Sequence, residues 1–265
     1  MEHLMATYKR QPVAFTRGEG CWLWDSAGKQ YLDAIGGIAV CALGHAHPEI
    51  TAAIVDQAST LLHTSNLFRI PLQEKLAAEL TRVTHMDSAF FANSGAEANE
   101  CAIKLARLFG HKRGIELPTL VVAENSFHGR TLATLSASGS RKIQAGFDPL
   151  VRGFVRVPYD DVDALQTVAR NSPQVVAVML EPIQGEGGIR IASPAYLHAV
   201  RQLCDQHGWL MIFDEIQTGM CRTGNWLAAH GVDVKPDVVT LAKALGNGIP
   251  IGACLTRGEA NTIFQ

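Results

Sequence analysis

The sequence lacks the features that mark several specialised classes of protein. No run of 18 consecutive apolar residues occurs, which argues against a membrane-spanning helix. The net charge is −2 and the pI is near 6.5, so nothing indicates a nucleic acid or a membrane surface as partner. Residues 1–10 are polar and contain no apolar core of a secretory signal. Internal repeats and low-complexity linkers are also missing.

Cysteine pairs and nucleotide-binding motifs are absent as well. The six cysteines are scattered without a C-x-x-C spacing, which is typical of reduced thiols in a cytoplasmic protein and not of a disulfide framework or a zinc site. His45 and His47 form an H-x-H pair, but no further ligands cluster with them, and we expect no metal. Neither a Walker sequence nor G-x-G-x-x-G occurs, so a nucleotide phosphate has less support than another phosphate.

The pattern of apolar runs predicts an α/β fold. Apolar residues make up 47% of the 265 residues, which is ample for a large core. From about residue 89 to 256, short apolar runs alternate with amphipathic stretches, which predicts a mostly parallel sheet flanked by helices. Strands are predicted at 89–91, 119–123, 153–157, 175–180, 210–213, 237–241 and 249–256. Helices are predicted at 48–60, 71–83, 98–109, 161–169 and 194–207, and a small β-rich hairpin is predicted within 13–35.

Two charged residues follow the last apolar strands and carry the strongest chemical signal. Asp214 ends the run at 210–213, and Lys243 lies just past the run at 237–241. Because ligands of open α/β sheets bind at the carboxyl ends of strands, both side chains could face one crevice. A desolvated lysine is a nucleophile suited to a Schiff base, and an aspartate can keep a pyridine nitrogen protonated. These are the requirements of pyridoxal phosphate, although a structural ion pair would give the same pattern.

Other strand ends carry further candidates. Ser94 and Glu97 form a capping box at a helix start, where Gly95 would let a phosphate come close. Phe127 offers a ring for stacking and Arg130 a fork for a carboxylate, with core packing and a surface ion pair as the alternatives. The stretch 181–188 places two carboxylates, Glu181 and Glu186, among glycines, which indicates close approach of a ligand or a plain loop. Taken together, the set matches the phosphate, ring, nitrogen and aldehyde of pyridoxal phosphate.

Several motifs resemble the class III, fold-type I aminotransferases. They are N-S-G-A-E-A-N-E-C-A-I-K-L-A-R (93–107), F-H-G-R-T (127–131), E-P-I-Q-G-E-G-G (181–188), F-D-E-I-Q-T-G-M-C-R-T-G (213–224) and L-A-K-A-L-G-N-G-I-P-I-G-A (241–253). The stretches 37–48 and 63–68 are most similar to the acetylornithine branch of this family. The resemblance covers nearly the whole chain.

The resemblance implies a role for each matching residue. Lys243 would bind pyridoxal phosphate covalently and move the proton, and Asp214 would pair with the ring nitrogen. The remaining residues would surround the cofactor or bind the substrate: Ser94, Gly95 and Ala96 at the phosphate, Phe127 and Ile216 on the two ring faces, Gln217 at the phenolic oxygen, Arg130 at a substrate carboxylate, and Glu186 as the partner of a C-terminal arginine.

The resemblance also implies the reaction. The δ-amino group of N2-acetylornithine would pass to 2-oxoglutarate, giving N-acetylglutamate 5-semialdehyde and glutamate in arginine biosynthesis, in a cytoplasmic homodimer. Ile38 stands where ornithine aminotransferases carry a tyrosine, and an aliphatic residue suits an acetylated amine. Succinylornithine, ornithine, 4-aminobutyrate and β-alanine remain alternative donors, and an aminomutase is a further alternative.

The resemblance predicts two domains as well. Residues 1–60 would belong to a small domain with its connecting helix, and 61–265 to the cofactor-binding large domain. Family members continue with a further strand, a threonine that reaches the partner's phosphate, and a C-terminal small domain. We expect a chain that lacks them, and a catalytically incomplete cofactor-binding fragment is the alternative of a different class.

Overall fold

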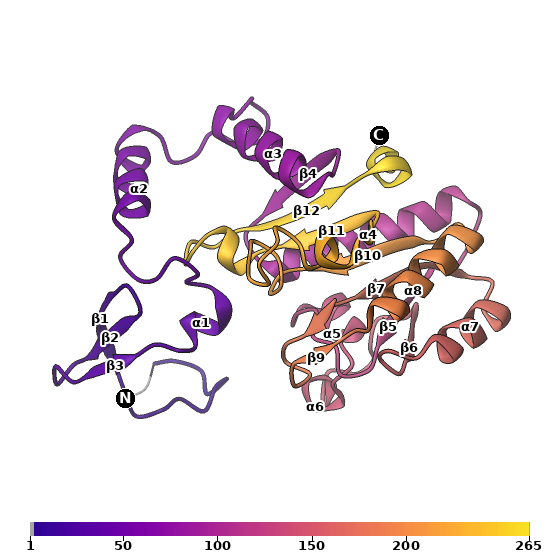
Figure 1. The fold of residues 1–265 in the computed structure, drawn as a ribbon, viewed down its shortest axis with the longest axis horizontal. Helices are drawn as coiled ribbons and strands as arrows, with labels where there is room; N and C mark the ends of the chain where they lie inside the picture. Colours follow the sequence, from indigo (N-terminus) through magenta and orange to yellow (C-terminus); the bar gives the residue numbers. More distant parts are fainter. Residues whose placement is uncertain (1–2, 265) are drawn as a thin grey trace. The chain divides into compact units, whose positions relative to one another are not determined.

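The structure is a computed structural model that describes residues 3–264 (Figure 1). Met1, Glu2 and Gln265, at the outer limits of the predicted domains, lie outside the described residues. By its internal contacts the chain separates into two units, Met1–Ser65 and Asn66–Gln265. No helix in the described range combines the length and the apolar character needed to span a bilayer.

The first unit begins with a small antiparallel sheet. Its strands, in order, are β1 (Phe15–Glu19), β2 (Trp22–Asp25) and β3 (Gln30–Leu32). The carboxylate of Asp25 accepts the N–H groups of Ala27 and Lys29, each at 2.9 Å, and so closes the turn between β2 and β3. The predicted hairpin around the D-x-x-G turn is confirmed, and β1 extends it by one strand.

Two helices follow, α1 (Gly36–Ala39) and α2 (Pro48–Thr60). Gly36 and Gly37 have φ of 56° and 67°, a left-handed backbone that glycine adopts readily, and this explains the predicted break in the pattern. The bounds of α2 are those predicted. No described residue of this unit is buried, so the apolar side of α2 remains exposed. The ring of His45 pairs with Asp33 at 2.7 Å.

The second unit is built on a seven-stranded sheet. In spatial order its strands are β4 (Ser88–Ala92), β12 (Gly252–Thr256), β11 (Val238–Leu241), β10 (Leu210–Asp214), β7 (Val175–Leu180), β5 (Thr119–Ala123) and β6 (Phe154–Val157). β12 runs antiparallel to both neighbours, and the other adjacent strands are parallel. The predicted mostly parallel sheet is therefore confirmed. A short pair, β8 (Ile183–Gln184) and β9 (Arg190–Ile191), occupies a stretch that the sequence predicted as a loop.

The helices and 3-10 turns of this unit connect the strands. They are α3 (Pro71–Thr84), α4 (Gly95–Lys112), α5 (Leu132–Ala137), α6 (Arg141–Gln144), α7 (Val162–Asn171), α8 (Pro194–His207), η1 (Ala228–Val232), η2 (Lys243–Leu245) and η3 (Gly258–Thr262). Ser193 caps α8 by accepting the N–H of Tyr196, as predicted. α5 and α6 were not predicted, because each is too short to show a helical period. The last strand begins at Gly252 and not at residue 249, since residues 246–248 form a turn and a bend follows at residue 249.

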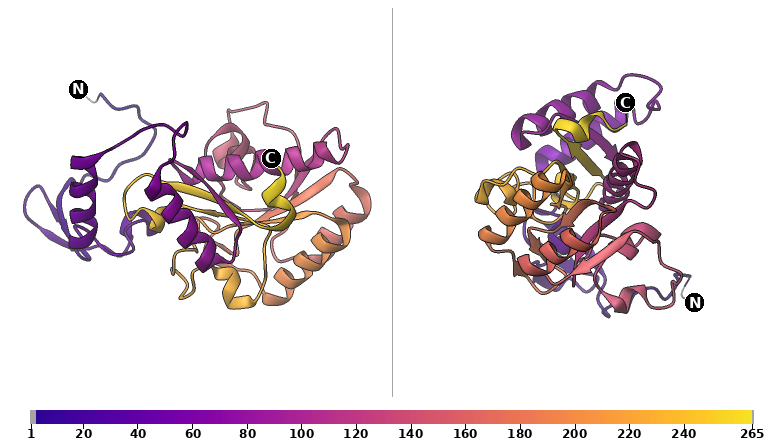
Figure 2. Two further views of the ribbon diagram at one scale, coloured as in Figure 1. Left: turned by 90° about the horizontal axis from the view of Figure 1, so that it is seen from above. Right: turned by 90° about the vertical axis from the view of Figure 1, so that its right-hand side faces the viewer.

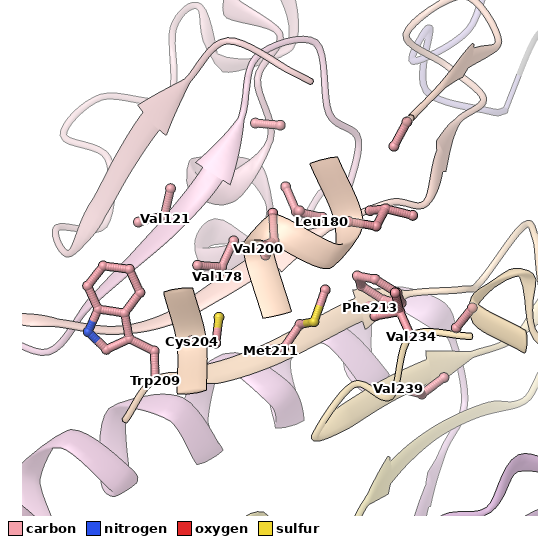
Figure 3. Packing of buried hydrophobic residues seen from close by; sticks show 14 of the residues in the cluster. Val121, Val178, Leu180, Val200, Cys204, Trp209, Met211, Phe213, Val234 and Val239 are labelled. Carbon is pink, nitrogen blue, oxygen red and sulfur yellow. The ribbon is translucent and has the colours of Figure 1, made fainter. Parts of the chain in front are cut away.

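The core has two layers, one on each face of the sheet. Along β10, Met211 and Phe213 join the cluster beneath α8, whereas Leu210 and Ile212 join the cluster beneath α4. Figure 3 shows the first cluster, with Met211 and Phe213 beside Val200 and Cys204 of α8. α7 and α8 lie on one side of the sheet and α4 on the other (Figures 1 and 2). The near-continuous apolar strands follow from burial on both faces.

Candidate functional site

Asp214 lies at the carboxyl end of β10 and points to the face of the sheet that α4 covers. Asn99 of α4 donates to its Oδ2 at 2.8 Å, and the ring Nδ1 of His128 lies 2.8 Å from the same oxygen. The N–H of Ile216 donates to Oδ1 at 3.1 Å. Asn99 is itself held by Thr240, which donates to Asn99 Oδ1 at 2.7 Å. A buried carboxylate with this many donors is fixed in position.

His128 carries a proton toward Asp214. Burial works against its charged form, but the hydrogen bond and charge of Asp214, together with the charge of Glu181, raise its pKa above the ordinary value. Its Nε2 is buried without a hydrogen-bond partner among the described residues. An unsatisfied buried ring nitrogen is costly, and at a strand-end crevice it is a feature that a ligand can satisfy.

Lys243 follows β11 and opens η2 with a left-handed φ of 49°. Burial lowers the pKa of its amine, although the negative charges of Asp214, Glu186 and Glu181 oppose that shift. The lysine and the aspartate that the sequence placed in one crevice therefore act on each other electrostatically, across the carboxyl ends of neighbouring strands. A half-buried amine of lowered pKa is a better nucleophile at neutral pH.

Glu181, at the end of β7, is a second buried carboxyl group in this site. Its Oε1 accepts the N–H of Phe127 at 2.8 Å and so fixes the loop that carries the Phe127 ring. Burial raises the pKa of Glu181 to about 7; the charge of Asp214 adds to the effect, and the nearby His128 opposes it. This carboxyl group can therefore change its charge near neutrality, within reach of Lys243.

The start of α4 is the candidate anion site. Ser94 caps the helix by accepting the N–H of Glu97 at 3.2 Å, and its hydroxyl donates to the Glu97 carboxylate at 2.9 Å. That carboxylate accepts the backbone N–H of Asn93, so the predicted capping box is displaced by one residue. The first N–H groups of an 18-residue helix, from Gly95 and Ala96, have no partner inside the helix and can bind an anion.

The glycines of the site serve close packing between its own segments. A Cβ on Gly95 would lie 2.8 Å from the side chain of Ile216, and one on Gly185 would lie 1.6 Å from Gln217 Oε1. Ile216 is thus placed against the start of α4, and Gln217 against the loop after β7. The groups that approach these two glycines are protein side chains, and the approach of a ligand stays a prediction.

Two predicted substrate residues lie at the outer part of the site. Arg130 and Glu186 are both exposed, unlike Asp214 and Glu181. Glu186 is close enough for its charge to act on Lys243. Gly129, next to Arg130, packs on α4, since a Cβ there would lie 3.0 Å from that of Ala96. The F-H-G-R-T loop and the helix start are therefore neighbours.

The sequence reasoning gave no role to Asn99, His128 or Thr240, and it noted Glu181 only as one of two carboxylates in the stretch 181–188. Asn99 and Thr240 carried a signal, because each is a polar residue at a position where burial was expected. Asn99 and Thr240 interrupt the apolar faces of α4 and β11, and both are fully buried. Buried polar side chains need partners, and the pairing of two such residues could have been proposed.

The fold is that of aminotransferases among solved structures. An ornithine aminotransferase from Toxoplasma gondii superposes with a TM-score of 0.95 at 34% identity, over 99% of this chain and 63% of that one. An N-acetylornithine aminotransferase from Stenotrophomonas maltophilia gives a TM-score of 0.84 at 42% identity, over 97% of this chain and 65% of that one.

The family model for aminotransferase class-III matches residues 4–265, and the chain belongs to this family. An acetylornithine aminotransferase from Nitrosomonas europaea is 57% identical over all of this chain and 67% of its own length. One from Thermosynechococcus vestitus is 50% identical over 99% of this chain and 65% of its own length. The chain spans about two thirds of the length of these curated relatives.

Proposed function

We propose that this chain carries the pyridoxal phosphate site of an acetylornithine aminotransferase. The proposed reaction moves the δ-amino group of N2-acetylornithine to 2-oxoglutarate in arginine biosynthesis. The observation that carries the proposal is the pair formed by Lys243, with its lowered pKa, and the buried, fully hydrogen-bonded Asp214. The names of the relatives at 57% and 50% identity support the choice of substrate.

The residues present fit this cofactor. A primary amine, a fixed carboxylate and a helix start match its aldehyde, ring nitrogen and phosphate, and they lie at one edge of the sheet. When bound, pyridoxal phosphate supplies an electron sink for charge that develops on the substrate. Lys243 would hold it and Asp214 would face the ring nitrogen. Ser94, Gly95 and Ala96 would bind the phosphate, Phe127 and Ile216 would flank the ring, and Gln217 would bind its phenolic oxygen.

Residues of this chain would then carry out the proton transfer and the binding of the substrate. The amine of Lys243 would take a proton from the substrate carbon that bears the amino group and return one later, which its lowered pKa favours. His128 would keep Asp214 oriented, since it shares Oδ2 with Asn99. Arg130 would bind a carboxylate of the substrate. Glu186, exposed beside Lys243, would change partners between the two half-reactions.

The assembly and location are further parts of the proposal. We infer a homodimer in the cytoplasm, with residues 1–60 in a small domain and 61–265 in the large one. These inferences rest on the family resemblance and on the scattered cysteines. Small molecules, acetylornithine and 2-oxoglutarate, would be the partners of the site.

An assay of the purified chain tests the proposal. Pyridoxal phosphate, N2-acetylornithine and 2-oxoglutarate are added, and glutamate formation is followed beside a Lys243→Ala variant. We expect acetylornithine to be preferred over ornithine, succinylornithine and 4-aminobutyrate, and turnover to vanish in the variant. Turnover that persists without Lys243 would overturn the assignment.

A second candidate function follows from the chain's share of its relatives' length, about two thirds. In this alternative the chain binds pyridoxal phosphate without completing turnover. Cofactor absorbance that depends on Lys243, together with no glutamate from any donor, would favour this candidate. Turnover with acetylornithine would exclude it.

A further inference from the structure

α4 and β12 pack unusually closely at the edge of the sheet that bears the site. A Cβ on Gly252 would lie 2.1 Å from the carbonyl oxygen of Ser94 and 3.4 Å from the Cβ of Ala98. Cys254 follows Gly252 by two residues and so points to the same face of β12. Cys101 follows Ala98 by three residues and so lies on the same side of α4.

The register of the sheet places these two cysteines independently. Cys254 is directly opposite Thr240 of β11, and Thr240 donates to Asn99 of α4. The side chain of Cys254 therefore faces α4, and it belongs to the core cluster against which Cys101 packs. The two thiols are hydrogen-bonded to each other.

The two thiols differ in exposure and in acidity. Cys254 is buried, whereas Cys101 is partly exposed and can meet a reagent from solvent. The hydrogen bond from Cys254 lowers the pKa of Cys101; burial opposes this shift, and the charge of Lys104 assists it. The same hydrogen bond, with burial, raises the pKa of Cys254. Cys101 is therefore the more acidic thiol of the pair and forms the thiolate more readily than Cys254.

We propose that Cys101 and Cys254 form a reversible oxidation site, in which Cys101 reacts first and Cys254 resolves the product into a disulfide between α4 and β12. The oxidant is a low-molecular-weight disulfide of the glutathione class. The Cys101 thiolate attacks one sulfur of that disulfide and expels one thiolate, which leaves a mixed disulfide on Cys101. Cys254 then loses its proton, and its sulfur attacks that of Cys101 and expels the second thiol. Two protein thiols are oxidised and one small disulfide is reduced to two thiols.

The other four cysteines provide the contrast. Cys21 and Cys221 are exposed, and Cys204 is buried in the cluster on the opposite face of the sheet. Cys41, like Cys21, belongs to the first unit. The site is therefore specific to one pair, and its chemistry does not depend on the proposed aminotransferase activity.

The test uses the full chain in a Cys21→Ser/Cys221→Ser background, which removes the two exposed thiols. After treatment with oxidised glutathione, mass spectrometry without reduction should find the peptides of Cys101 and Cys254 linked, and a thiol titration should fall by two. Dithiothreitol should restore both thiols. A chain that keeps both thiols free, or that links another pair, overturns the proposal.

Two variants separate the roles of the thiols. Cys254→Ala should accumulate a glutathione adduct on Cys101, because no resolving thiol remains. Cys101→Ser should show no adduct on Cys254, since the buried thiol meets no reagent. Cys204→Ser is the matched control and should form the 101–254 link as the background chain does. An adduct on Cys254 in the Cys101→Ser chain would reverse the roles and contradict the mechanism, and far-UV circular dichroism verifies that each variant is folded.

Discussion

Asp214 and Glu215 follow one another at the carboxyl end of β10, and their side chains enter two different regions of the large unit. Asp214 is held by side chains from elsewhere in the chain, Asn99 of α4 and His128 of the loop after β5. Glu215 is held within its own following loop. Its two oxygens accept the hydroxyl of Thr218 at 2.6 Å and the N–H groups of Ala228 and Ala229 at 2.8 and 2.9 Å.

Both carboxyl groups are buried, so burial does not distinguish their roles. Their hydrogen-bond partners do. The loop around Glu215 is closed by backbone donors at the start of η1, which is a structural clamp. Burial raises the pKa of Glu215, although the donors from Thr218, Ala229 and Ala228 oppose the shift. Around Asp214, the partners include an ionisable ring, and a half-buried lysine lies within electrostatic reach. We expect the first region to respond to mutation in stability and the second in activity.

The largest expected effect is on the Asp214 side. Asp214→Asn removes the charge that holds His128 and faces the proposed ring nitrogen, so kcat should fall by about 10²–10³-fold, comparable to the loss of one preorganised electrostatic group. Glutamate formation from acetylornithine measures the change. A variant with normal kcat would mean that Asp214 is no more than a second structural clamp.

The raised pKa of Glu181 makes the stability of the Asp214 region depend on pH. Its pKa in the folded chain, about 7, is raised above the ordinary value of 4.5, so the folded state binds the proton more tightly than the unfolded state. Its contribution to stability is full below pH 4.5 and is lost as pH rises through about 7, by about 3 kcal/mol. His128, whose pKa is also raised, acts in the same direction.

The control for that pH effect is Glu181→Gln, which should remove its share of the decline. Urea unfolding at about pH 5 and about pH 8 measures the free energy of unfolding on both sides of the transition. An undiminished decline in the variant would assign the effect to other groups.

A smaller effect is expected on the Glu215 side. Glu215→Gln replaces one of the two accepting oxygens by an NH2 group, which cannot accept a hydrogen bond from the three donors around it. The free energy of unfolding should therefore drop by about 1–3 kcal/mol. Pyridoxal phosphate binding, followed by absorbance under native conditions, should persist. If kcat instead fell as far as in Asp214→Asn, the two regions would not be separable.

The smallest effect should come from Thr218→Ala. This change removes one hydroxyl donor to Glu215 and leaves the two backbone donors in place, for a loss of about 1 kcal/mol in stability. Chemical denaturation measures the loss. kcat/KM should not change, and a decrease would indicate that the loop after β10 reaches the substrate.

The sequence predicted the strands of the large unit because burial on both faces leaves continuous apolar runs. It also placed Asp214 and Lys243 at one edge, since parallel strands end together. It did not predict which of Asp214 and Glu215 faces α4. Alternation along β10 groups Asp214 with Leu210 and Ile212, but only packing shows that α4 covers that face.

Long-range pairing explains the other omissions. Asn99 meets Asp214 across 115 positions of sequence, and no local pattern specifies such a partner. The displacement of the capping box to Asn93 depends on how β4 enters α4. In the first unit, the sequence predicted the bounds of α2 correctly. The apolar pattern of this helix did not predict that its apolar side would remain exposed.

The position of β12 has a consequence for the order of folding. β4 is joined to the sheet through β12, and the hydroxyl groups of Ser88 and Thr256 meet at 2.9 Å across 168 positions of sequence. During synthesis, β4 and the helix start that follows it must therefore wait until β12 has emerged. Closing so long a loop is slow, and until then the edge of β11 is unpaired. The proposed phosphate site and its lysine would thus come together in one late step.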